Sequence, residues 1–534
     1  MQALPTIANI AWGLASLAAW RRYRRALEDP AATQERLLQR YLRDNANTVA
    51  GRKYGFSSIR TIAEYQSRVP ISTFDAIAPL VEHIARGDDN VLTSQPVHRL
   101  VPSSGSTAAV KLIPYTTTLQ REFSEAVDAW IADLYLGMPA LAAGPAYWCI
   151  TPAASSERPF VDERSRVPVG FEDDGAHLGG VRAALARAVM AVPATVRLSH
   201  NLESFRRATL VHLLCAADLR LISVWHPSYL SMLFDTLIQD WSRLVDDVAA
   251  RDAARGRRLS RLAPDQISTI WPRLRLISCW GDGPARSHAA DLAARTGGIA
   301  IQPKGLLATE GVVTIPFGGH SPVAIRSHFF EFLTADGHPT LVHQLERGVE
   351  YSVVLTTGGG LYRYHLADRV IVNGTVGRTP SLEFSGKDDR LSDRFGEKLS
   401  DGFVARVLDR LFTTTARPRF AMLAPEELAG QVAYTLFVES GSGPPEGGPY
   451  EYDYEYDADR DAALEARLEA GLRANPHYAW CVDIGQLRPS RVVRVGAGAD
   501  RAYVDFCVAQ GQKLGDIKPV SLHPRSGWAG VLPC

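Results

Sequence analysis

The feature that most constrains the fold is a pair of similar apolar segments, each followed by a turn and a helical pattern. Residues 219–225 read LRLISVW, and residues 274–280 read LRLISCW. Each run is mostly apolar, as expected for a buried strand. Helical patterns follow at residues 229–247 and 285–295. This repetition predicts an α/β fold in which helices cover a sheet and ligands bind outside the carboxyl ends of the strands.

Composition argues against several classes of protein. The 534 residues are 46% hydrophobic and 22% charged, which is enough for a large core. Lysine and arginine number 58, as do aspartate and glutamate, so no global field attracts nucleic acid. The six cysteines form no C-x-x-C pair, which argues against a zinc site or a disulfide framework. We therefore expect a globular, cytoplasmic protein that does not bind nucleic acid.

The first apolar stretch is too short to cross a membrane. Residues 5–20 are uncharged and are followed by the basic run 21–25, whereas a span needs about 20 apolar residues. A signal peptide would carry its positive charge before the apolar run. We expect a buried or surface-docked first helix and no integral membrane segment. Peripheral membrane contact through Trp12, Trp20 and the arginines is the alternative.

Residues 103–111 read SSGSTAAVK and have the chemistry of a phosphate-binding loop. Small side chains let backbone N–H groups approach phosphate oxygens, and the hydroxyl groups add donors. Lys111 adds a compact positive charge. The glycine spacing differs from that of a P-loop. An ordinary Ser/Thr turn with a solvated lysine is the alternative interpretation.

The composition changes after Val372. A linker pattern at residues 374–380 precedes a charged stretch, and helical and strand patterns follow it. Strands are expected at residues 432–439, 491–495 and 502–508. The pattern predicts a separate α+β domain of about 150 residues.

Several motifs, in this order, resemble the adenylate-forming superfamily. The closer match is the auxin-responsive-promoter family of acyl-acid amido synthetases, known from plants with relatives in bacteria; we identify the chain as a bacterial-type member. The resemblance rests on SSGSTAAVKLIP (103–114), LISVWHPSYL (221–230), GLLATEGVVTIPF (305–317), TTGGGLYRYHLADRV (356–370), the charged linker (384–398) and GQKLGDIKP (511–519). It covers nearly the whole chain.

The resemblance implies two domains. Residues 1–380 would form a large adenylation domain, with β-sheets flanked by helices and a small β-barrel, which binds ATP and the acyl acid. Residues 381–534 would form a smaller, mobile α+β lid that rotates between two reaction steps.

The resemblance also implies site residues. The nucleotide site would comprise Ser103, Ser104, Gly105, Ser106, Lys111, Thr309, Glu310, Tyr364, Asp368 and Lys387. Glu310 would hold Mg²⁺, which takes few protein ligands besides substrate phosphates. Asp368 would accept hydrogen bonds from both ribose hydroxyls. Lys398 and Lys518, with Glu310, would be the catalytic residues, although a lone lysine is usually solvated.

Four features of the chain depart from the family pattern. Ala108 and Ala109 replace loop glycines, and Leu307 with Ala308 replaces a segment that usually holds a tyrosine. Lys387 stands where an arginine is common, and a lysine cannot form a bidentate fork. Ala367 replaces the glycine that usually precedes the aspartate.

The implied reaction needs no protein nucleophile. A carboxylate attacks the α-phosphate of ATP, and an amine, usually of an amino acid, then displaces AMP. Positioning and charge neutralisation would supply most of the catalysis. The alternatives are a thiol acceptor, such as coenzyme A or a carrier protein, and a nucleotide-binding protein without catalysis. His226 either faces the acyl pocket or is structural. The acid, the amine and the oligomeric state are left open.

Overall fold

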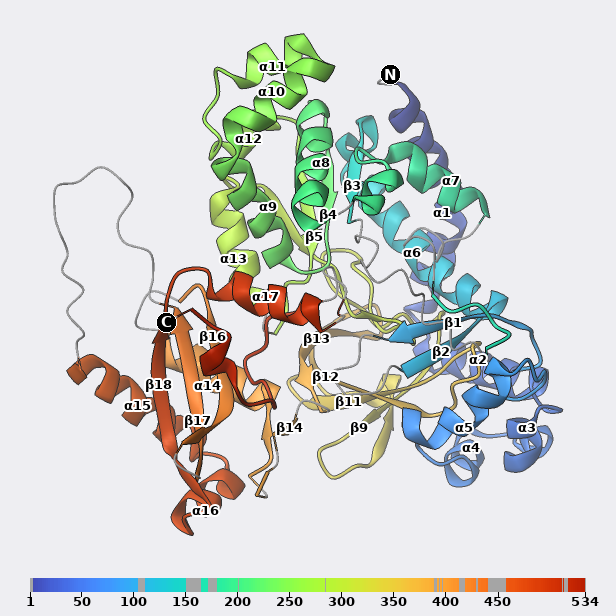
Figure 1. Ribbon diagram of the computed structural model, residues 1–534. Helices are drawn as coiled ribbons and strands as arrows, with labels where there is room; N and C mark the ends of the chain where they lie inside the picture. The colour runs from blue at the N-terminus through green and yellow to red at the C-terminus, as the bar shows by residue number, and fades with distance from the viewer. Residues whose placement is uncertain are drawn as a thin grey trace. The chain divides into compact units, whose positions relative to one another are not determined.

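The computed structural model forms two compact units. The first comprises residues 1–282 and 288–384, and the second comprises 283–287 and 385–534 (Figure 1). The predicted division at 380–381, and the assignment of the parts as adenylation domain and mobile lid, stay predictions. The residues described are 3–103, 111–149, 165–170, 180–199, 201–283, 285–388, 391–392, 394–395, 397–412, 418–428, 431–439, 458–510, 512 and 517–533.

The two similar apolar segments form neighbouring strands of a parallel sheet. The sheet has the order β3 (Ala146–Trp148), β4 (Leu221–Ser223), β5 (Leu276–Cys279), β6 (Ala300–Pro303), with every pair parallel. Leu221 lies opposite Leu276 and Ser223 opposite Ser278, so the repeats align residue by residue. Helices α8 (Leu202–Cys215) and α9 (Pro227–Gln239) lie beside these strands. The predicted α/β fold is therefore confirmed.

A second sheet, with antiparallel pairs from β10 to β12, lies in the first unit except for residues 385–387 at the end of β13. Its order is β10 (Pro339–Leu341), β9 (Phe329–Leu333), β11 (Glu350–Thr356), β12 (Tyr364–Val376), β13 (Thr379–Lys387). Within the described residues no pairing joins β10 to β13, so the small β-barrel that was expected is an open sheet. Among the described residues, the segment 314–323 contributes the isolated bridges Thr314–Val323, Phe317–His320 and Pro322–Ser381. Pro322 in this segment has no N–H group to donate to a ladder.

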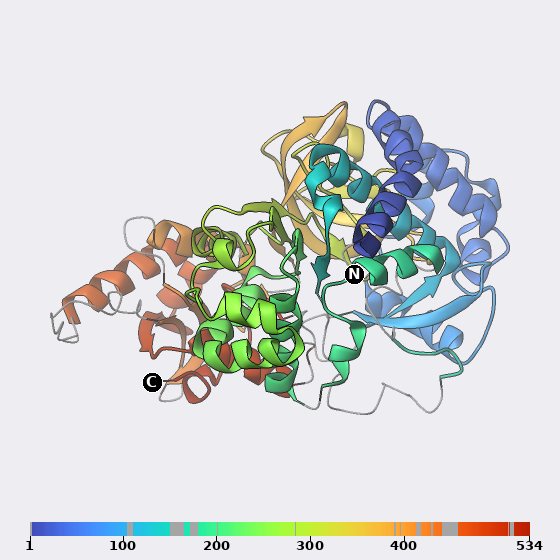
Figure 2. The same cartoon turned by 90° about the horizontal axis from the view of Figure 1, so that it is seen from above.

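The long helices of the first unit pack on this sheet and on one another. Helix α6 (Thr117–Gly137) begins at Thr116, whose side chain accepts from the Leu119 N–H. Helix α1 (Ala3–Ala26) lies along α6 (Figure 2). The remaining helices and strands are α2 (Pro30–Asp44), α3 (Val49–Tyr54), α4 (Ile62–Arg68), α5 (Phe74–Ala85), β1 (Val97–Ser103), β2 (Lys111–Thr116), α7 (Gly180–Val189), α10 (Trp241–Arg251), α11 (Ala253–Leu259), α12 (Ile267–Ile270), α13 (Ala285–Arg295), β7 (Leu307–Ala308) and β8 (Gly311–Val312). Within the described residues, no helix has the length and apolarity that a bilayer crossing requires.

The second unit is an α+β structure. Strands β16 (Ala421–Leu428) and β17 (Gln431–Glu439) are antiparallel, and β17 pairs in parallel with β18 (Leu487–Val495). Its other elements are β14 (Leu391–Ser392), β15 (Leu399–Ser400), α14 (Asp401–Leu411), α15 (Ala458–Leu472), α16 (Pro476–Asp483) and α17 (Ala499–Ala509). The strand predicted at 502–508 is wrong, because this segment lies in α17. Its buried residues Ala499, Tyr503, Val504 and Cys507 recur at helical spacing.

Candidate active site

The predicted phosphate loop connects two paired strands. Ser103 at the end of β1 lies opposite Lys111 at the start of β2. Ser104, Gly105 and Ser106 lie outside the described residues. The antiparallel pairing nevertheless brings both ends of the loop together, so the hydroxyl of Ser103 and the half-buried Lys111 start from adjacent positions.

The Thr-Glu motif lies next to the start of this loop. Thr309 and Glu310 form the two-residue turn between β7 and β8, where Ala308 pairs with Gly311. The Glu310 side chain is buried, and its Oε1 accepts a hydrogen bond from Ser103 Oγ at 3.0 Å. A hydroxyl group and a carboxylate from two motifs 207 residues apart therefore meet directly.

His328 fixes the far side of this turn. Its Nε2 accepts from the Val312 N–H at 3.0 Å, and a Cβ on Gly311 would lie 2.8 Å from the same nitrogen. Because Nε2 accepts, a neutral ring carries its proton on Nδ1, which lies 3.2 Å from Glu122 Oε2. The turn that holds Glu310 is thus connected to the Glu122 network described next.

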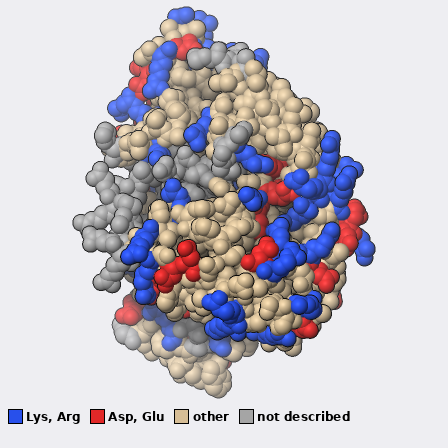
Figure 3. All heavy atoms as spheres, turned by 90° about the vertical axis from the view of Figure 1, so that its right-hand side faces the viewer, with Lys and Arg blue, Asp and Glu red and all other residues tan. Residues whose placement is uncertain are grey.

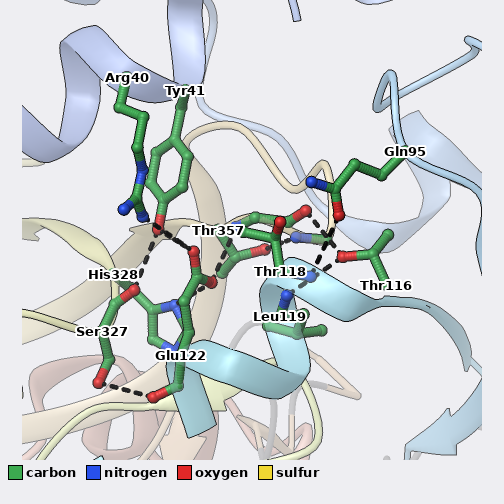
Figure 4. A network of polar contacts seen from close by, with 12 residues as sticks. Arg40, Tyr41, Gln95, Thr116, Thr118, Leu119, Glu122, Ser327, His328 and Thr357 are labelled. Carbon is green, nitrogen blue, oxygen red and sulfur yellow. Dashed lines mark hydrogen bonds and ion pairs between the residues drawn. The ribbon is translucent and has the colours of Figure 1, made fainter. Parts of the chain in front are cut away.

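Glu122 on α6 is the centre of a buried polar network (Figure 4). Its Oε1 accepts from Tyr41 Oη at 2.6 Å, and its Oε2 accepts from the Gly358 N–H at 3.0 Å. Thr116 Oγ1 donates to the Gly358 carbonyl at 3.0 Å. Burial, and next the Glu122 charge, raise the pKa of Tyr41 well above its usual value. The network holds the glycine-rich loop 356–360 against the start of α6.

Asp368 lies in a bulge of β12. Ser352 and Val354 of β11 pair with Arg369 and His365, so β12 has two more residues than its partner over this stretch. A bulge of this kind re-aims the side chains within it. Ala367 adopts a left-handed conformation, with φ of +62°, and the Asp368 side chain is buried. Tyr364, the first residue of β12, is buried in the hydrophobic core, and its role as a nucleotide ligand stays a prediction.

Sequence reasoning missed a buried ion pair at Arg363, the residue directly before β12. Arg363 donates two hydrogen bonds to Glu331, from Nε at 2.9 Å and Nη2 at 3.0 Å. Its Nη1 donates to the carbonyls of Gln66 and Val69. The signal was present, because Glu331 is the one acid in the apolar strand FFEFL, and Arg363 stands between two tyrosines. A charge within an apolar run requires a partner.

A second missed group lies where the parallel sheet ends. Lys304 follows β6 and is buried. Its Nζ donates to Ser223 Oγ at 2.8 Å and lies 4.4 Å from the centre of the Trp225 ring. Burial raises the pKa of the adjacent Cys279 thiol to about 12. A lysine placed directly after a strand of an α/β sheet was the signal for this cluster. His226 is also buried, and its Nδ1 accepts from the Ser228 N–H as the N-cap of α9, a structural role.

Three of the four predicted lysines, Lys387, Lys398 and Lys518, belong to the second part of the chain. Lys387 ends β13, and Lys518 is half-buried, with its carbonyl accepting from Tyr503 Oη at 2.9 Å. The Lys398 side chain is exposed, and its backbone has φ of +47°. Glu397 beside it is fully buried and accepts from the Arg394 and Phe395 N–H groups. The structure therefore brings together Ser103, Lys111 and Glu310 in the first unit. The other three predicted lysines lie in the second unit.

The fold and these motifs define a class of protein. The chain superposes on the solved structure of 2-hydroxyisobutyryl-CoA ligase in the postadenylation state with a TM-score of 0.52 and 12% identity, over 88% of this chain and 87% of that chain. The fold is that of the adenylate-forming ligases, an α/β fold that combines sheets and helices.

The family is narrower than this class. The GH3 family N-terminal domain matches residues 19–256 and the GH3 family central domain matches residues 321–387, together more than half of the chain. Indole-3-acetic acid-amido synthetase GH3.2 of Arabidopsis thaliana is 22% identical over 442 residues, which cover 72% of this chain and 79% of that protein. The solved AtGH3.15 acyl acid amido synthetase in complex with 2,4-DB gives a TM-score of 0.79 at 17% identity, covering 98% of this chain and 96% of that one. The chain belongs to the GH3 family.

Proposed function

We propose that the protein is an ATP-dependent acyl-acid amido synthetase. It joins a carboxylic acid to an amine, the amine being that of an amino acid, and releases AMP and pyrophosphate. The observation that carries this proposal is the hydrogen bond from Ser103 to Glu310, because it unites the predicted phosphate loop with the Thr-Glu motif. The names of the relatives support the same reaction.

The first step takes place on the first unit. A carboxylate oxygen of the acid bonds to the α-phosphorus of ATP, and the bond from that phosphorus to pyrophosphate breaks. Ser103, Ser104, Gly105, Ser106 and Lys111 hold the phosphates, and Thr309 contacts the α-phosphate. Asp368, held by the bulge of β12, accepts from the ribose hydroxyls, and Tyr364 lines the nucleotide site.

The donor set fits a magnesium ion that comes with the nucleotide. Among the described residues there is no group of three or more His, Cys, Asp or Glu side chains that suits a metal ion. Mg²⁺ requires no such group, because it is usually held by one or two carboxylates and substrate phosphates. The buried Glu310 carboxylate beside Ser103 provides one such ligand. When bound, the ion would neutralise charge on the phosphates.

The second step uses the second unit. The amine nitrogen bonds to the acyl carbonyl carbon, AMP leaves, and the amine loses a proton. Residues 381–534 act as a mobile lid on the adenylation domain of residues 1–380, and Lys387, Lys398 and Lys518 reach the adenylate from it. No enzyme thioester is required, and the buried Cys279 thiol, with its pKa raised to about 12, is a poor nucleophile.

Two alternatives make different predictions. A thiol acceptor, either coenzyme A or a carrier protein, would give a thioester after the same first step. A non-catalytic relative, suggested by Ala108 and Ala109, would bind ATP without releasing pyrophosphate. We also propose that the protein is cytoplasmic and is a bacterial-type member of its family.

The test is mass spectrometry of a pooled reaction that contains the protein, Mg·ATP, a library of carboxylic acids and the common amino acids. We expect AMP together with a product whose mass is acid plus amino acid minus water, which identifies both substrates. Glu310→Gln and Asp368→Asn should lower AMP formation at least about a hundredfold, given the weight of charge-stabilising groups in such reactions. Glu346→Gln, on a turn of the same unit, is the matched control.

Three outcomes would contradict the proposal or its site. AMP that forms only with coenzyme A would support the thiol acceptor. ATP binding without AMP would support the non-catalytic alternative. Full activity of both the Glu310 and the Asp368 variants would reject the residue assignments.

A further inference from the structure

Helix α1 is firmly attached along one face. Asn9 Nδ2 donates to the Gly144 carbonyl at 2.8 Å, and Tyr135 Oη on α6 donates to Asn9 Oδ1 at 2.6 Å. Trp20 Nε1 donates to Asp133 Oδ1 at 3.0 Å, and Trp12 is buried. Both tryptophans considered for membrane contact are therefore used in holding α1 on α6.

The opposite face of α1 is apolar and exposed. Leu4, Ile7, Ile10 and Leu14 expose between 50% and 64% of their surface. Positions 4, 7, 11, 14 and 18 recur every three or four residues and therefore share one face. The outer stripe of α1 consists of Leu4, Ile7, Ile10, Ala11, Leu14, Ala15 and Ala18, all of them exposed. It precedes Ala19, where the match to the GH3 N-terminal domain begins.

The stripe ends in arginines. Helix α1 contains Arg21, Arg22, Arg24 and Arg25 and no acidic residue. Arg22 is used in a bidentate pair with Glu125, and Arg24 stacks over Trp20. Arg21 and Arg25 continue the stripe and are exposed, and their side chains form no hydrogen bond or ion pair with any described residue. On the face that Figure 3 shows, basic and acidic side chains are interspersed.

We propose that the outer stripe of α1, with Arg21 and Arg25, binds the surface of an anionic lipid bilayer. An amphipathic helix of this kind lies in the plane of the membrane and places its aliphatic side chains at the boundary between headgroups and acyl chains. The two guanidinium groups meet lipid phosphates, with which they form charge-assisted hydrogen bonds. The helix lies on the membrane without crossing it.

The charges favour a lipid surface over a second copy of the chain. In a parallel pair of stripes, Arg21 and Arg25 would face the same arginines. In an antiparallel pair they would face the partner's apolar Leu4 and Ile7 and the positive end of its helix dipole. Neither arrangement provides an anion, whereas a layer of lipid phosphates provides one at each arginine.

The experiment is vesicle flotation of the full chain with phosphatidylcholine, with and without phosphatidylglycerol. We expect binding to the anionic vesicles and at least about a tenfold loss of affinity in Leu4→Ser/Ile7→Ser/Leu14→Ser, since three aliphatic contacts disappear. Arg21→Gln/Arg25→Gln should lose about fivefold per arginine, and added salt should have the same effect on the wild type. Leu136→Ser/Leu198→Ser, which removes equally exposed leucines elsewhere, should bind like the wild type.

Circular dichroism and amide formation in solution should be unchanged in every variant, which separates this proposal from the proposed reaction. Equal binding of the three-serine variant and the wild type would overturn the proposal, as would equal binding to both kinds of vesicle. The proposal would also be overturned, in favour of a second copy of the chain, by a different pair of results. These are a wild-type chain that does not bind vesicles but forms a dimer, and a three-serine variant that is monomeric by light scattering.

Discussion

Two segments near the start of β12 each contain positions that sterically favour glycine, but only one of the two segments has glycine there. In the loop at 356–360, glycines occupy the crowded positions: a Cβ on Gly358 would lie 2.3 Å from Thr118 Cγ2, and one on Gly360 would lie 2.7 Å from Leu92 Cβ. In the bulge at 366–368, the left-handed position is occupied by Ala367 instead of glycine. The glycine loop fits without strain, whereas the bulge keeps an unfavourable backbone directly before Asp368.

The difference teaches where strain is tolerated. In the glycine loop, both backbone polar groups of Gly358 are bonded, the N–H to Glu122 and the carbonyl to Thr116. A Cβ added to this loop would meet a neighbouring residue. The bulge is half-buried at Ala367 and is preceded by Arg363, whose four hydrogen bonds fix the chain entering β12. We infer that this ion pair supports the strained bulge. Substitutions at three positions test the contrast between the bulge and the glycine loop.

The largest effect is expected for Arg363→Met, which removes the support. It leaves the Glu331 carboxylate buried without its bidentate partner, and such a loss typically costs about 3–5 kcal/mol. We expect a correspondingly lower midpoint in urea and faster hydrogen exchange of β9 and β11. Arg207→Met is the control, because its pair with Asp247 is about one-third exposed on both sides and should contribute under about 1 kcal/mol. Equal losses in the two variants would show that Arg363 does not support the bulge.

Gly358→Ala should have the next largest effect. Its Cβ would meet Thr118 and lie 2.6 Å from Glu122 Oε1, so either the loop or α6 must shift. Overpacking of this kind costs about 1–3 kcal/mol, and the hydrogen bond to Glu122 should weaken with it. Gly374→Ala, with nothing within 4 Å of its Cβ, is the matched control in β12, the strand that follows this loop. Stability of Gly358→Ala equal to that of the control would show that the loop is not crowded in solution.

Sequence reasoning predicted the α/β sheet and singled out the loop at Ser103 and the Thr-Glu motif because their signals are local. The runs at β4 and β5 are buried strands whatever surrounds them, and Ser103 and Glu310 lie in motifs whose pattern is contiguous. For Glu122, Lys304 and Arg363 the sequence shows at most that a buried charge needs a partner. It does not show which residue that partner is, because the partner lies far along the chain. The strand expected at 502–508 failed because a short apolar run suits either element, and the helical spacing only shows once Ala499 is included.

Ala367, which stands where the family usually has glycine, is an intermediate case between the features that sequence reasoning predicted and those that it missed. The sequence showed that alanine replaces a glycine before Asp368, but only the structure shows that the position has φ of +62°. An alanine in this conformation destabilises the folded state by about 1–2 kcal/mol, whereas a glycine destabilises it by about 0.5–1 kcal/mol through the loss of chain entropy on folding. Ala367→Gly should therefore stabilise the first unit by about 0.5–1 kcal/mol, the smallest of the three effects, with KM for ATP changed less than about twofold.

Ala367→Val completes the series, because a β-branched residue at this φ is strained further and should lower the urea midpoint. Stability in the order Gly, Ala, Val would establish that the bulge stores backbone strain. If glycine were instead less stable than alanine, the Ala367 methyl group would contribute more by packing than its backbone costs. The bulge would then be held by contacts, as the glycine loop is, and the contrast between the two segments would disappear.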